Sequence, residues 1–172
     1  MQSTESAARR LQDHAVLWSI GEIRAGDVVG AACDALVAGL DSPALRALAA
    51  RTRAEADHDV PEILPAALDE LNLTFYYYPV DSVAGQEAVV RALARRMLAG
   101  ELTPRELACR IQKRFGYELP LTERLAELDD EYDSLDYGGG RAPTQVDAEV
   151  TAEAHRLAQH PRTAPEPPDA PA

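Results

Sequence analysis

The chain has 172 residues, of which 46% are hydrophobic and 5% aromatic, and its formal net charge is -12. This hydrophobic fraction is too high for a wholly disordered chain, and no apolar run approaches the roughly 18 residues of a membrane span. The acidic excess disfavours a general binder of duplex DNA, because neutralising phosphates requires a basic surface. We therefore expect a soluble globular protein with no membrane segment and no direct contact with nucleic acid.

The cysteines and the N-terminus favour a cytoplasmic location. Two cysteines are too few for a small secreted domain stapled by disulfides, and no apolar stretch follows a basic start. Cys33 shares a helical face with Val29, Leu36 and Val37, so we expect a buried free thiol. No histidine or CxxC spacing activates Cys109, so a nucleophilic role is not expected.

Apolar residues at a period of 3.6 predict helices along most of the chain. The first helix ends near Gly21, and the second covers residues 27–38. Ser42 is the predicted N-cap of a short third helix, with Pro43 in its first position. The same Gly-x-x-[Ser/Thr]-Pro pattern recurs 61 residues later, at 100–104. It fits either an old duplication or a common way of joining two helices.

Pro61 is predicted to begin the fourth helix, because proline is tolerated in a first turn. The preceding Asp57-His58-Asp59 then forms a short charged loop. It could orient the imidazole for acid–base chemistry, but no serine or cysteine nucleophile lies nearby in the sequence. A catalytic role for His58 is therefore not expected.

Residues 74–79 interrupt the helical pattern and hold four of the eight Tyr and Phe residues. Exposed tyrosines are favoured interface anchors, whereas tyrosines between helices can plug the end of a core. Alternation in an extended segment allows both, with Phe75 and Tyr77 on one side and Tyr76 and Tyr78 on the other. Tyr76, Tyr77 and Tyr78 are therefore candidate partner-binding residues.

Three further helices are predicted before a glycine run at 138–140. The first ends at Gly100 and carries Glu87, Arg91 and Arg95 as an exposed charge row, with an inner face of Val90, Leu93, Ala94 and Met97. The second begins after Pro104 and ends near Gly116, and its apolar stripe is Leu107, Ala108, Ile111 and Phe115. The third covers residues 121–135 and has a narrow apolar stripe.

Residues 129–136 carry five carboxylates in eight positions. Asp129, Asp133 and Asp136 fall on one helical face, and hard cations such as Mg²⁺ prefer oxygen ligands, but no second element supplies the rest of a ligand set. Closely spaced carboxylates repel one another, which an open surface tolerates and a basic partner relieves. A solvated or partner-binding face is the preferred interpretation. The candidate acids are Asp129, Asp130, Glu131 and Asp133.

The predicted fold class is all-α, a compact bundle of six or seven helices with an appended C-terminal helix and a disordered tail. The predicted segments are a bundle domain at 1–137, a linker at 138–143, an appended helix at 144–159 and a proline-rich tail at 160–172. Residues 1–116 hold 16 acidic and 13 basic residues, and residues 117–172 hold 13 and 4. The acidity is therefore expected in the last third.

From Leu11 to about Leu157 the chain resembles a class of small alanine- and arginine-rich helical proteins common in actinomycete genomes. The stretches that carry this resemblance are 14–18, 39–46, 100–107 and 128–133. The resemblance implies an actinobacterial source and a helical fold, and the class has no assigned activity.

A shorter stretch is similar to colicin-type nuclease immunity proteins. It comprises Tyr77-Tyr78-Pro79, a polar turn, Glu87-Ala88-Val89-Val90 and a helix ending at Gly100. In that family, paired tyrosines and nearby acids bind a basic toxin domain. Thr74 stands where the family has an acidic residue.

The favoured hypothesis is a non-enzymatic acidic module that binds a basic protein, as an inhibitor or immunity-type partner, without a cofactor. One alternative is an enzyme or metal-binding protein with a carboxylate-bound divalent cation, for which Asp129 and Asp133 would be ligands. Another is a nucleic-acid mimic that blocks a DNA-binding protein. Electrostatic steering would speed encounter with a basic partner.

Overall fold

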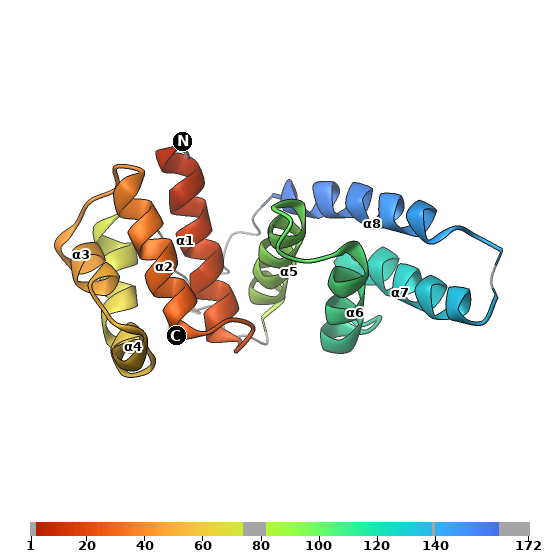
Figure 1. Ribbon diagram of the computed structural model, residues 1–172, viewed down its shortest axis with the longest axis horizontal. Coiled ribbons are helices and arrows are strands. Elements are labelled where there is room, and N and C mark those ends of the chain that lie inside the picture. The colour runs from red at the N-terminus through yellow and green to blue at the C-terminus, as the bar shows by residue number, and fades with distance from the viewer. Residues whose placement is uncertain (1–2, 74–81, 139, 162–172) are drawn as a thin grey trace, which may run out of the picture. The chain divides into compact units, whose positions relative to one another are not determined.

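The structure is a computed structural model that describes residues 3–73, 82–138 and 140–161, apart from the side chain of Asp136. Within these ranges the backbone forms eight α-helices, one short 3₁₀ turn and no strand, which confirms the predicted all-α class (Figure 1). The contacts group the helices into two compact units, residues 1–80 and 81–172. Of the predicted tail at 160–172, residues 162–172 lie outside the described residues.

The first unit contains four helices, in which α2 contacts each of the other three. Their bounds are Thr4–Ser19 for α1, Ala25–Val37 for α2, Pro43–Ala49 for α3 and Arg53–Glu70 for α4. Leucines from α1, α3 and α4 meet small alanine side chains of α2 in a single buried cluster. Alanines let neighbouring backbones approach closely, so α2 forms the centre of this unit.

The buried face of α2 differs from the predicted one. Val28, Ala31 and Ala35 are buried, whereas Cys33 is exposed, so the expected buried thiol is wrong. Val37, on the predicted inner face, is 89% exposed. Small side chains form the packed face of α2, and the larger side chains Val29 and Leu36 are only partly buried beside it.

Helix α4 begins eight residues earlier than predicted, and the expected charged loop 57–59 is therefore helical. The N–H of Thr52 donates to Oε2 of Glu55 at 2.9 Å, which satisfies a donor at the helix start. Pro61 and Pro65 then lie inside the helix. Interior prolines cost helix stability, and the burial of the apolar face of α4 offsets that cost.

The repeated Gly-x-x-[Ser/Thr]-Pro pattern performs the same local task twice. Gly39 and Gly100 adopt positive φ values of 93° and 79°, which glycine tolerates without a Cβ clash. Ser42 Oγ accepts the Leu45 N–H at 3.1 Å, and Thr103 Oγ1 accepts the Glu106 N–H at 3.2 Å. In each case five residues separate the end of one helix from the start of the next.

The second unit contains α5, α6, a 3₁₀ turn called η1, α7 and α8. Their bounds are Val83–Leu98, Pro104–Phe115, Pro120–Thr122, Glu123–Asp136 and Pro143–Ala158. The predicted inner residues of α5 and α6 are confirmed as buried. These residues are Val90, Leu93, Ala94, Met97, Leu107, Ala108, Ile111 and Phe115.

Helix α8 contacts α5, α6 and α7, and Figure 1 shows it running from beside α7 to α5. Its buried residues are Val146, Val150, Ala154 and Leu157. It is thus part of the second unit, and the division into units falls after Val80, whereas the sequence suggested a linker at 138–143. The cause is apolar burial, because this stripe of α8 needs the surface of α5 to cover it.

Arg91 is buried, which corrects the expected exposed charge row on α5. Arg91 Nη1 donates to the carbonyl of Pro161 at 3.3 Å, and Arg95 Nη1 donates to the carbonyl of Ala158 at 3.1 Å. Carbonyls at a helix C-terminus lack intrahelical donors and carry partial negative charge. The two arginines therefore hold the end of α8 on α5.

In the described ranges, none of the helices combines the length and the apolarity that crossing a bilayer requires.

Candidate interaction surface on α7

Helix α7 follows the η1 turn and buries one side against its unit. Leu125, Ala126, Leu128 and Tyr132 are buried, and together they form the packed side of α7. The predicted acids lie at positions beside this buried stripe. Asp130 and Asp133 are exposed, and Asp129 and Glu131 are partly buried. The structure therefore places the four acids on one helix in two distinct environments.

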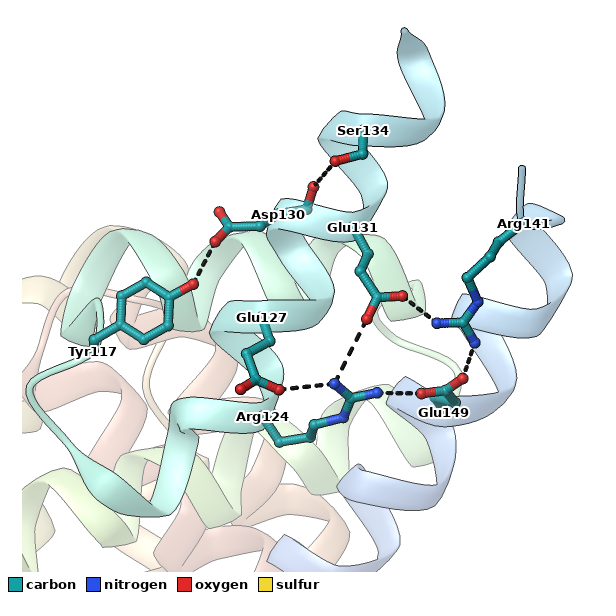
Figure 2. Close-up of polar contacts among 8 residues, drawn as sticks. All are labelled: Tyr117, Arg124, Glu127, Asp130, Glu131, Ser134, Arg141 and Glu149. Carbon is teal, nitrogen blue, oxygen red and sulfur yellow. Dashed lines mark hydrogen bonds and ion pairs between the residues drawn. The ribbon is translucent and has the colours of Figure 1, made fainter. Parts of the chain in front are cut away.

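Glu131 belongs to a ring of ion pairs that links α7 with α8 (Figure 2). Arg124 and Arg141 each pair with both Glu131 and Glu149, so the charges alternate around the ring. Arg124 also pairs with Glu127, with Nη1 and Oε2 2.8 Å apart. The arginines lower the pKa of Glu149 below its usual range, because each hydrogen-bonds its carboxylate.

Asp130 accepts a hydrogen bond from the hydroxyl of Tyr117, which comes from the loop after α6 (Figure 2). This bond and the surrounding carboxylates raise the pKa of Tyr117 to about 12. The Tyr117 side chain is otherwise half-exposed, and its ring lies beside α7. Tyr117 thus brings an aromatic group to the acidic helix that sequence reasoning did not assign there.

Asp129 and Asp133 form no ion pair with a described side chain. Partial burial raises the pKa of Asp129, and the charges of Asp133 and Asp130 raise it further. Arg105 and Lys113 act in the opposite direction without abolishing the shift. Within the described residues, the two cationic side chains of α6 therefore offset the negative charge at this end of the face only in part.

Tyr132 ties the buried side of α7 to two neighbours. Its hydroxyl donates to Asp147 on α8, and the Arg105 guanidinium lies 5.5 Å from its ring centroid. Burial and the Asp147 carboxylate raise the pKa of Tyr132, so the phenol stays protonated. The contacts fix α7 relative to α6 and α8, and they orient its acidic side outward.

The other predicted candidates do not join this surface. Tyr76, Tyr77 and Tyr78 lie outside the described residues. Over the part of the chain that the structure describes, no group of three or more His, Cys, Asp or Glu side chains could hold a metal ion. His58 is exposed on α4, where its Nδ1 lies 2.9 Å from Asp59 Oδ1, and this contact raises the pKa of His58.

Arg124, Arg141 and Glu149 were missed by sequence reasoning. Arg124 stands three residues before Glu127 and seven before Glu131, a spacing that places all three on one helical face. A short connection between two helices also predicts antiparallel neighbours, which would bring residues 141–149 near α7. Only the tertiary structure shows which atoms of these residues pair.

Comparisons with models of protein families, with curated proteins and with solved structures found no match for this chain. Function is therefore argued from the geometry and charge of the surface itself.

Proposed function

We propose that this protein is a non-enzymatic, acidic helical module that binds a basic protein, as an inhibitor or immunity-type partner does. The observation that supports this most directly is that Asp129 and Asp133 lie close together on α7 and form no ion pair with a side chain that the structure describes. The raised pKa of Asp129 means that its ionised form is disfavoured in the free protein. A cationic side chain of a partner would relieve that repulsion, so binding would stabilise a charge arrangement that the isolated chain tolerates at a cost.

The test is capture of partner proteins on the immobilised full-length chain, from a lysate of the organism that encodes it. The Asp129→Asn/Asp133→Asn variant should lose a basic protein that the wild type retains. The matched control is Asp57→Asn/Asp69→Asn, which removes the same two charges from exposed positions on α4. If the α7 variant and the wild type recover the same proteins, the proposed function fails.

Two further experiments test whether the aromatic run belongs to the interface and whether the partner binds DNA with the same surface. A Tyr76→Ala/Tyr77→Ala/Tyr78→Ala variant that loses the same protein would add the aromatic run to the interface. If DNA displaces the captured protein, the module acts by nucleic-acid mimicry on a DNA-binding partner. If DNA leaves it bound, recognition is independent of the partner's nucleic-acid surface.

A further inference from the structure

Glu131 and Glu149 hold one guanidinium group between two helices. The Nη1 atom of Arg141 pairs with Oε2 of Glu131, and its Nη2 atom pairs with Oε1 of Glu149 (Figure 2). The two carboxylates are 18 positions apart in the sequence, so the packing of α7 against α8 creates the site. Two carboxylates on the two terminal nitrogens match the planar fork of arginine, which an ammonium group does not reproduce.

The two arginines of the ring differ in how they are held. Arg124 lies on α7, and it pairs with Glu127 of the same helix as well as with the ring. Arg141 precedes α8 by two residues and follows the glycine run 138–140, so no helix of its own fixes its backbone. Its side chain is 43% exposed, and those of Glu131 and Glu149 are 30% and 37% exposed. The occupied site therefore opens to solvent.

We infer that Glu131 and Glu149 form a guanidinium-binding site, and that Arg141 is its internal, displaceable occupant. This inference rests on the proposed function, because the arginine that replaces Arg141 is supplied by the basic partner. One guanidinium exchanged for another preserves both ion pairs, so displacement of Arg141 costs little. Arg141 then acts as an autoinhibitory contact. The apparent affinity of the site for the partner's arginine falls in proportion to the fraction of molecules in which Arg141 leaves the site free.

The experiment measures binding of a fluorescent nona-arginine peptide to the full-length chain by anisotropy at low ionic strength. Arg141→Gln should tighten binding about two- to fivefold, the factor expected when a competing surface ion pair of ordinary strength is removed. Arg141→Lys keeps the net charge and should tighten binding less. The gain should be smaller for a nona-lysine peptide, because an ammonium group lacks the planar fork.

Two controls separate site occupancy from net charge. Arg9→Gln removes an exposed arginine that pairs with Glu5 in the first unit, so it makes the same charge change elsewhere. Adding Glu149→Gln to Arg141→Gln should abolish the gain, because half of the site is lost. Circular dichroism checks that each variant keeps the helicity of the wild type.

The outcomes distinguish this inference from the proposed function. The inference is overturned if Arg141→Gln and Arg9→Gln raise peptide affinity equally, or if the rise in affinity survives Glu149→Gln. It is also overturned if no form of the protein binds the peptide. If Asp129→Asn/Asp133→Asn weakens partner capture while Arg141 variants leave peptide binding unchanged, the proposed function stands and the internal occupant does not.

Discussion

Partial burial and the neighbouring carboxylates of α7 raise the pKa of Asp129. Its raised pKa means that ionisation costs the folded state free energy above that pKa, and the cost disappears where Asp129 is protonated in both states. Asp129→Asn should therefore be more stable than the wild type at neutral pH. The difference should shrink as the pH falls toward the ordinary pKa of an aspartate.

Thermal melts of the two forms between neutral pH and about pH 4 check this sign, since model aspartates titrate near there. Asp57→Asn controls for the loss of one charge at an exposed site on α4. A variant that is less stable than the wild type at neutral pH, or a difference that grows on acidification, would contradict the account of Asp129.

The sequence predicts the acidic face of α7, but it does not predict which side chains pair with those acids. The run at 129–133 identifies a charged helix face from composition alone. The sequence does not reveal that Glu131 is shared between Arg124 and Arg141, or that Asp130 accepts from Tyr117. These contacts join residues 7 to 13 positions apart, and all except the Arg124–Glu131 pair depend on how α7 meets its neighbours. Periodicity describes one helix at a time.

Among the elements, α5 and α6 could be predicted well and α2 and α4 less well. Large apolar residues at helical spacing mark the buried faces of α5 and α6, and Thr103 with Glu106 marks the start of α6. The packed face of α2 consists mainly of alanines, which give a weak periodic signal. In α4, Pro61 resembles a helix start, and the true start at Arg53 depends on Thr52 and Glu55.

Arg91 connects two elements, because it joins the middle of α5 to the chain just after α8. Its guanidinium also lies 3.7 Å from Oε2 of Glu87, whose side chain is only 12% exposed. Arg91→Leu should destabilise the protein by about 3 kcal/mol, because it leaves the Glu87 charge nearly buried without this arginine. Urea unfolding followed by circular dichroism measures the loss.

The double variant Arg91→Leu/Glu87→Leu identifies the cause. It should recover part of the lost free energy, since replacing both ions by apolar side chains removes the Glu87 charge together with the arginine. A double variant as unstable as Arg91→Leu alone would locate the loss in contacts of Arg91 other than the one with Glu87, such as that with Pro161. Arg9→Leu, at an exposed pair, should change stability by less than about 0.5 kcal/mol.

At the scale of the whole molecule, the two units divide the charge equally. Residues 1–80 hold 12 acidic and 6 basic residues, and residues 81–172 hold 17 and 11, so each unit has a net charge of -6. Within the second unit, α7 holds seven acidic residues and one basic residue, whereas α6 holds four basic residues and one acidic residue. Both helices affect the pKa of Asp129. Arg105 and Lys113 of α6 lower it, whereas the neighbouring carboxylates of α7 raise it.

The division of the chain into two compact units predicts separate responses to core substitutions. Trp18 is the only tryptophan of the chain, and it packs against the core of the first unit. Leu64→Ala removes a fully buried side chain of that core, and Leu157→Ala removes one from the second unit. Each should cost about 2–5 kcal/mol in its own unit.

Leu64→Ala should shift the urea midpoint of Trp18 fluorescence, whereas Leu157→Ala should shift only part of the circular-dichroism transition. Equal shifts of both signals in both variants would mean that the chain unfolds as one cooperative body, because two-state unfolding gives coincident transitions for every probe.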